Sequence, residues 1–111
     1  MMKITWVDDD SYAAAAQEDR SAPRTRINVP ARLRPTGYKR RNVFLRNISL
    51  SGFSVASIDR LPAHTRCRLT IPEVGRFDAR SIWWEQGRGG GFAFEQLLDS
   101  RILATIIARS S

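Results

Sequence analysis

The chain has 111 residues, 42% of them hydrophobic, and a formal net charge of +7. This length allows one domain with a modest core, and no apolar run approaches the length of a membrane-spanning helix. A single cysteine, Cys67, excludes an internal disulfide framework, and residues 1–10 lack the apolar stretch of a secretory signal. These features predict a soluble cytoplasmic protein without a membrane span.

The positive charge is concentrated in one third of the chain. Residues 20–58 contain nine Lys or Arg and no Asp or Glu, whereas the remainder contains nine basic and eleven acidic residues. A concentrated positive field attracts an anionic partner such as a nucleic acid, a nucleotide or a membrane headgroup. Charge alone leaves a second interpretation open, in which a solvated arginine-rich face only keeps the protein soluble.

Residues 1–19 differ in composition from the rest of the chain. They contain five acidic residues and an alanine run at positions 13–16. We interpret them as an acidic N-terminal arm, either a short helix or a flexible segment. The domain itself is expected to cover residues 20–111.

The middle of the chain has the patterns of strands. Apolar Ile27, Val29, Ala31 and Leu33 alternate with polar residues, which predicts a strand over residues 26–34 with one solvated face. Pro30 in that strand indicates an edge or a bulge. Further strands are predicted at 42–48, 53–58, 66–71, 76–85 and around 92–95. The glycine-rich residues 87–91 are interpreted as the turn before the last strand.

The C-terminal segment has a helical pattern instead. Its apolar residues fall on one side of a helical wheel, and they are Leu98, Ile102, Leu103, Ile106 and Ile107. This pattern predicts an amphipathic helix over about residues 97–109 that covers an apolar surface. Six short strands with frequent turns favour a small barrel or sandwich, so the predicted class is all-β with a C-terminal helix.

Few residues suit catalysis or metal binding. His64 and Cys67 are the only residues of their types, which is too few for a metal site, and Cys67 is interpreted as a small buried apolar residue. The glycines at 87–91 lie between two strands, whereas a phosphate-binding loop leads from a strand into a helix. We therefore expect no catalytic residue, no metal site and no cofactor.

Two short segments suit a nucleotide. Arg20 and Arg24 lie just before the first strand, and an arginine offers a planar fork of donors for phosphate oxygens or the O6 and N7 edge of guanine. The guanidinium plane also stacks on bases. Asn47, Ser49 and Gly52 follow the second strand, where polar side chains surround a glycine able to adopt φ > 0 and admit a ligand. Together they fit a guanine-rich, doubly negative ligand.

These residues also carry a family resemblance. Arg20 and Arg24 match the RxxxR motif of PilZ domains, and Asn47, Ser49 and Gly52 match the family's [D/N]xSxxG motif at a fitting separation. A weaker match is Trp84 followed by the sequence GFAF at residues 91–94. The chain resembles this bacterial family over about residues 19–108.

The resemblance implies a six-stranded antiparallel β-barrel with a C-terminal helix that binds cyclic di-GMP and is not an enzyme. It implies that Arg20 and Arg24 contact the phosphates and guanines, and that Asn47 and Ser49 contact a guanine edge. Gly52 would leave the floor of the binding surface open. Binding would order roughly residues 10–24 and signal to an unidentified downstream protein. Asp19 departs from the family, many members of which carry an arginine there, and is expected to affect affinity or stoichiometry.

Two alternatives remain open. The first is a PilZ-like adaptor that acts through protein contacts without binding the nucleotide. The second is a small basic barrel that binds single-stranded nucleic acid, which requires exposed aromatic side chains on the basic face. Tyr38 is the one clearly free aromatic residue in the basic third, so nucleic acid ranks last. Trp83 and Trp84 are expected to face opposite sides of their strand.

Overall fold

The computed structural model describes residues 24–56 and 58–110. The acidic arm and Arg20 lie outside these residues. The described chain forms six strands and one helix: β1 (Thr25–Pro35), β2 (Arg41–Ile48), β3 (Gly52–Val55), β4 (Arg66–Ile71), β5 (Gly75–Glu85), β6 (Gly89–Phe94) and α1 (Ser100–Arg109). The predicted class, all-β with a C-terminal helix, is confirmed.

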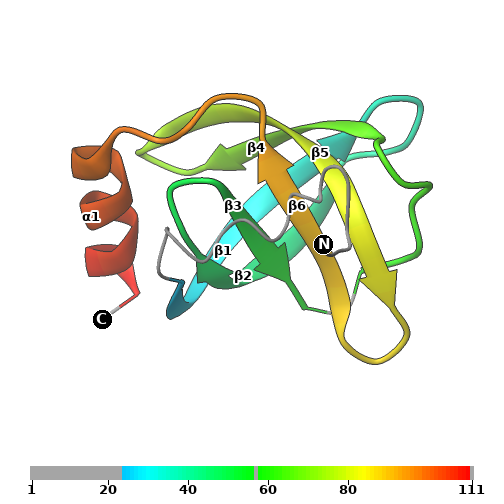
Figure 1. The fold of residues 1–111 in the computed structure, drawn as a ribbon, viewed down its shortest axis with the longest axis horizontal. Coiled ribbons are helices and arrows are strands. Elements are labelled where there is room, and N and C mark those ends of the chain that lie inside the picture. The colour runs from blue at the N-terminus through cyan, green and yellow to red at the C-terminus, as the bar shows by residue number, and fades with distance from the viewer. Residues whose placement is uncertain (1–23, 57, 111) are drawn as a thin grey trace, which may run out of the picture.

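The strands close into one antiparallel barrel in the order β1-β2-β3-β6-β5-β4 (Figure 1). Closure pairs β1 with β4 as well as with β2, so Arg32 and Leu33 of β1 are opposite residues of both neighbours. The predicted six-stranded antiparallel barrel is confirmed. The pairing of β1 with β4 begins only at Arg32, so Pro30 lies where that side of β1 is unpaired, as a strand proline requires.

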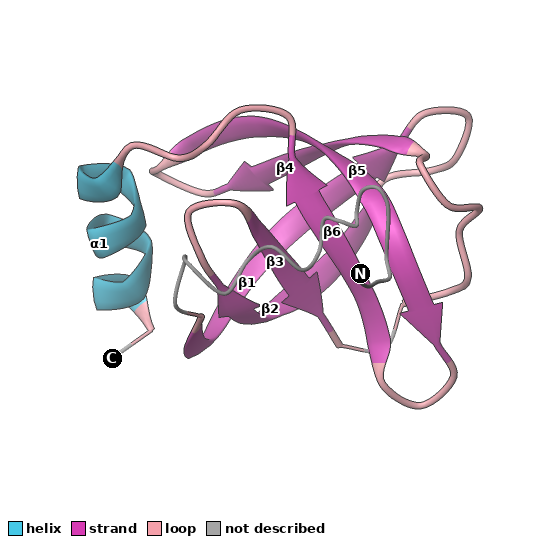
Figure 2. Ribbon diagram, viewed as in Figure 1, coloured by secondary structure: helices cyan, strands magenta, loops and turns pink. Residues whose placement is uncertain are grey.

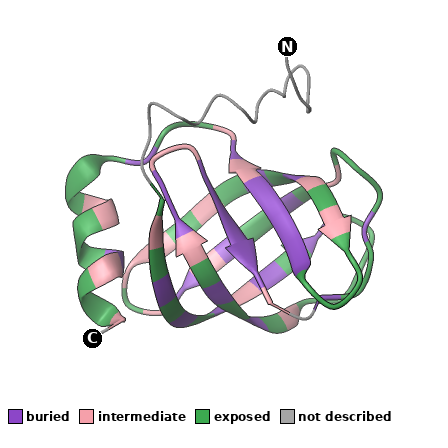
Figure 3. Cartoon of the chain, turned by 60° about the horizontal axis from the view of Figure 1, so that its bottom comes forward, coloured by how far each residue is buried: buried purple, intermediate pink, exposed green. Residues whose placement is uncertain are grey.

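The core is the barrel interior, and buried and exposed residues alternate along β1 and β4, whereas β3 is buried throughout (Figure 3). Ile27, Val29, Ala31 and Leu33 of β1 all face inward, as their alternation predicts. Phe53 stacks on Phe92 with ring centroids 5.0 Å apart, and these residues lie on neighbouring strands β3 and β6.

Two strand bounds differ from the sequence-based expectation. The third strand ends at Val55, and Ile58 belongs to the connection that follows. The sixth strand begins at Gly89, so Gly89 to Gly91 are strand residues and not a turn. A Cβ at Gly89 would overlap the backbone carbonyl of Val55, so the glycine allows the neighbouring backbone to approach closely.

The helix α1 stands at the side of the barrel where β1 begins (Figures 1 and 2). Its first residue is Ser100 rather than position 97, because the Asp99 carboxylate caps it and accepts a hydrogen bond from the Arg101 backbone at 2.7 Å. That hydrogen bond lowers the pKa of the Asp99 carboxyl. Ile106 is fully buried, and the Asn28 backbone N–H donates to the Ser110 hydroxyl at 2.9 Å.

Among the residues that the structure describes, no helix is long and apolar enough to cross a membrane.

Candidate ligand-binding site

A bulge in β2 presents Asn47 to the outside of the barrel. Val43 and Leu45 face the core, so strict alternation would also turn Asn47 inward. The register of β2 against β3 shifts between Leu45 and Asn47, which makes Arg46 an extra residue on β2. As a result Ile48 is fully buried and Asn47 is partly exposed. Bulges commonly redirect a side chain next to a binding site.

The redirected Asn47 contacts the first motif. The Arg24 guanidinium Nη1 donates a hydrogen bond to Asn47 Oδ1 at 2.8 Å. The two predicted site residues, 23 positions apart in the chain, thus meet on the barrel surface. Arg20, the other motif arginine, lies outside the described residues.

Ser49 organises the turn that follows β2. Its backbone N–H donates to the Gly52 carbonyl at 2.8 Å. Its hydroxyl accepts hydrogen bonds from the backbone N–H groups of Ser51 and Gly52, both at 3.2 Å. Ser49 is fully buried, and these hydrogen bonds fix the loop that follows Asn47.

Gly52 is required for a different reason from the one expected. The described glycines with positive φ are Gly37, Gly75, Gly87 and Gly89, so Gly52 does not use the positive φ that a glycine allows. Gly52 is instead opposite Ala93 of β6, and a Cβ there would overlap the carbonyl oxygen of Phe92. Close approach of two strands therefore accounts for this glycine.

A row of paired residues extends from Asn47 across the outer face of the barrel. In order across β1, β2, β3, β6 and β5 these residues are Arg26, Asn47, Ser54, Gly91 and Trp83. Neighbouring strands are about 4.8 Å apart, so the row is about 19 Å long. Ser54 and Gly91 are small, buried residues and form a low floor between a polar end and the exposed indole of Trp83, which lies over Gly91.

The PilZ domain family model matches residues 18–109 of the chain. The chain belongs to the PilZ domain family. The matched region includes both sequence motifs, all six strands and the whole of α1. A comparison with curated proteins finds none whose sequence matches.

Within this PilZ barrel, the motifs assigned only Asn47 of the row, and two of the other four residues have exposed side chains. Arg26 is exposed and directly opposite Asn47, and Trp83 is 41% exposed. Trp83 and Trp84 face opposite sides as predicted, since the Trp84 indole N–H donates to the Ile58 carbonyl at 2.6 Å and packs against the core. The feature that singles out Trp83 is its pairing with Gly91, and this pairing is known only once the register of β5 against β6 is known.

Among the residues that the structure describes, the titratable groups elsewhere in the PilZ barrel include neither an activated thiol nor a cluster of metal ligands. Cys67 is buried, as predicted, and burial raises the pKa of its thiol to about 11 against the opposing effect of Arg41. A thiol with that pKa stays protonated at neutral pH and is a poor nucleophile. In the described ranges no three His, Cys, Asp or Glu side chains gather as metal ligands.

Proposed function

We propose that this PilZ protein is a receptor for cyclic di-GMP that relays the nucleotide signal to a partner protein. The observation that supports this most directly is the 2.8 Å contact between Arg24 and Asn47, which joins the two motifs beside the low floor of Ser54 and Gly91. A ligand with two guanines and two phosphates needs arginine forks, a polar base-edge partner and a flat surface side by side.

Each motif residue has a role in this proposal. Arg20 and Arg24 bind the phosphates and stack on or donate to the guanines. Asn47 binds a guanine edge, and Ser49 positions it by holding the turn through its hydroxyl. Gly52 keeps β3 and β6 close, which leaves the floor low enough for the ligand.

The signal is a change in the segment that precedes β1. In the proposal, ligand bound by Arg20 and Arg24 orders roughly residues 10–24, and a cytoplasmic partner binds that ordered form preferentially. A ligand shifts such an equilibrium only as far as its affinity differs between the two forms. The proposed role is binding and relay, with no catalytic step and no cofactor.

One sequence feature supports a second candidate, a PilZ adaptor that does not bind the nucleotide. Asp19 places a carboxylate next to Arg20, where it opposes the negative phosphates of the ligand. In this alternative the same surface serves protein contacts alone.

The test is calorimetric titration with cyclic di-GMP, with GTP and cyclic di-AMP as controls. We expect saturable binding of cyclic di-GMP alone. Arg24→Ala should weaken it by about ten- to a hundredfold, because a charge-assisted hydrogen bond contributes roughly 1.5–3 kcal/mol. The matched control is Arg101→Ala on α1, which removes the same charge from an exposed helical site and should bind normally.

The outcomes separate the candidates. A folded wild-type protein that gives no heat at high nucleotide concentration supports the adaptor and directs attention to Asp19. Unchanged affinity in a folded Arg24→Ala variant, as judged by circular dichroism, contradicts the role assigned to Arg24.

A further inference from the structure

A second basic surface lies at the far end of β1. A groove of about 1020 Å³ runs between the turn at residues 36–40 and the outer faces of β1, β4 and β5. Its lining includes two basic residues of the turn and five strand arginines, and the latter are Arg32, Arg34, Arg66, Arg68 and Arg76. We refer to this surface as the arginine groove.

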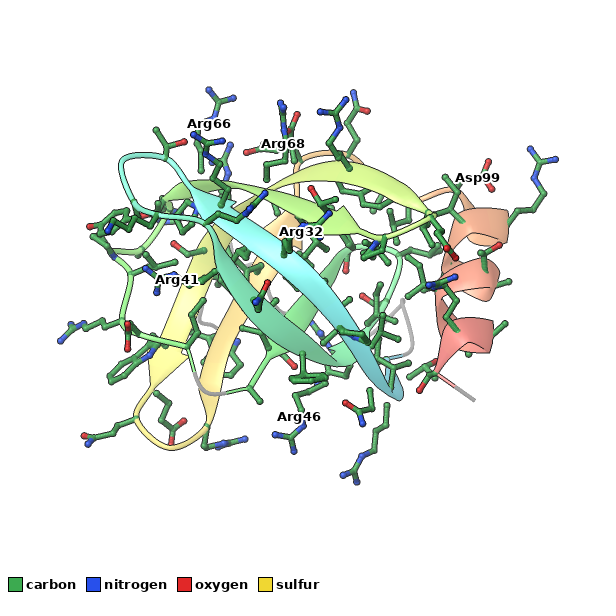
Figure 4. All side chains as sticks on the ribbon, turned by 180° about the vertical axis from the view of Figure 1, so that it is seen from behind. Arg32, Arg41, Arg46, Arg66, Arg68 and Asp99 are labelled. Atoms are coloured by element: carbon green, nitrogen blue, oxygen red, sulfur yellow. The ribbon has the colours of Figure 1, made fainter. Side chains whose placement is uncertain are left out.

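The arginine groove is separate from the candidate nucleotide site. Arg24 precedes the first residue of β1 and Arg34 is near its last, and ten residues of strand extend about 33 Å. Figure 4 shows Arg66 and Arg68 on one side of the barrel, while Arg46, the neighbour of Asn47, projects from the opposite side.

Most of the charge in the arginine groove is not neutralised. Its two acidic residues are already paired, Asp78 with Arg68 at 3.3 Å and Glu95 with Arg80 at 2.9 Å. Within residues 24–56 and 58–110, no carboxylate lies within 4.0 Å of Arg34 or Arg66, nor of Arg32 or Arg76.

The register also places like charges directly opposite each other. Arg34 of β1 faces Arg68 of β4, and Arg66 of β4 faces Arg80 of β5. Directly opposed like charges destabilise a sheet. A surface that lowers the stability of its own fold in this way is expected where the charges bind a partner.

The spacing of these charges matches an extended peptide. Arg32 and Arg34 on β1 are two residues apart, as are Arg66 and Arg68 on β4, which places each pair about 6.6 Å apart on one face. An extended peptide with an acidic residue at every second position presents carboxylates to one face at the same interval.

A nucleic acid fits the arginine groove less well. Tyr38, 44% exposed, is the one aromatic residue in its lining, so the surface offers little for base stacking.

We propose that the arginine groove docks an extended acidic segment of the protein to which this receptor signals. The proposal rests on the proposed function, because it gives the same partner a second contact, independent of the nucleotide, in addition to the ordered segment before β1. The nucleotide site and the partner site then lie at opposite ends of β1.

The experiment measures fluorescence anisotropy of a labelled twelve-residue peptide of alternating Glu and Thr at physiological salt. The comparison probes are the same peptide with Lys in place of Glu and a single-stranded oligonucleotide of equal net charge. The groove variant is Arg34→Glu with Arg66→Glu. The control is Arg88→Glu with Arg101→Glu, which makes the same change in net charge outside the groove.

We expect the acidic peptide to bind the wild-type protein, and the groove variant to weaken it at least about tenfold while the control changes it less than about twofold. Equal losses in the groove variant and the control overturn the proposal, because they show attraction to net charge alone. Tighter binding of the oligonucleotide than of the peptide, lost in the groove variant, also overturns it.

Cyclic di-GMP titration of the same variants separates this proposal from the proposed function. We expect the groove variant to keep its nucleotide affinity and Arg24→Ala to keep its peptide affinity. Peptide binding without nucleotide binding contradicts only the receptor role, and nucleotide binding without peptide binding contradicts only the docking surface.

Discussion

Gly52 shows how a residue of a binding motif also serves the fold. It belongs to the [D/N]xSxxG motif, yet its local requirement is the close approach of β6, whose Phe92 carbonyl occupies the space of a Cβ. A variant at Gly52 therefore changes the barrel before it changes any ligand contact. Loss of binding in such a variant would say little about the nucleotide, whereas Arg24 tests the site directly.

We expect Gly52→Ala to lower the free energy of unfolding by about 1–3 kcal/mol, because the added methyl group forces β3 and β6 apart. Urea denaturation measures the change. The control is Gly37→Ala, where nothing lies within 4 Å of a Cβ and only φ +85° opposes the substitution, at about 1 kcal/mol. If Gly52→Ala loses no measurable stability, β6 yields without cost and the close-approach argument is wrong.

Ser81 of β5 is one of the side chains that hold the connection between β3 and β4 to the barrel, besides Trp84. Ser81 is 3% exposed, and its hydroxyl donates to the Pro62 carbonyl at 2.6 Å and accepts from the Thr65 backbone N–H at 2.9 Å. The backbone of Ser81 bonds His64 and Thr65 as well. These hydrogen bonds fix residues 62–65 of the connection against β5.

Ser81→Ala should lower the free energy of unfolding by about 0.5–1.5 kcal/mol, because it removes two hydrogen bonds while the Pro62 carbonyl keeps the Thr65 hydroxyl as a donor at 2.6 Å. Thermal unfolding followed by circular dichroism measures the change. Ser100→Ala, at an exposed position in the first turn of α1, is the control and should shift the midpoint little. A midpoint for Ser81→Ala equal to that of the control would mean that water replaces the hydroxyl.

Charge across the whole barrel couples its stability to its proposed binding. Arg34 and Arg68 face each other because closure pairs β1 with β4, and their repulsion weakens at high salt. These opposed arginines destabilise the isolated domain, and they stabilise the complex once an anionic segment lies over them in the arginine groove. Stability and docking are therefore expected to change in opposite directions.

Arg34→Thr should raise the free energy of unfolding by about 0.2–1 kcal/mol at low salt, with a smaller gain at high salt. The same variant should lower the affinity for the acidic peptide. Thermal unfolding at several salt concentrations measures the gain in stability, and guanidinium chloride is not used because it is itself a salt. Arg32→Thr, which faces Thr70, controls for the strand preference of threonine and should gain less. Equal gains at all salt concentrations would show that repulsion between Arg34 and Arg68 is not the cause.

The sequence by itself determined the local elements and the family. Strict alternation placed β1 around residues 26–34 and β4 at residues 66–71, because one face of each strand is buried and the other is wet. The helical spacing of Leu98 to Ile107 indicated α1, and the motif residues from Arg20 to Gly52 indicated the PilZ family, which the match over residues 18–109 confirms.

Only the tertiary structure decided which side chains meet. The bulge at Arg46 turns Asn47 outward against the period of its strand, and the close approach of β3 and β6 explains both Gly52 and Gly89. The sequence located the charge excess in residues 20–58, but the arginine groove also takes Arg66, Arg68 and Arg76 from later strands. Barrel closure brings β4 beside β1, and neither local pattern nor composition contains that pairing, because it depends on contacts between residues far apart in the chain.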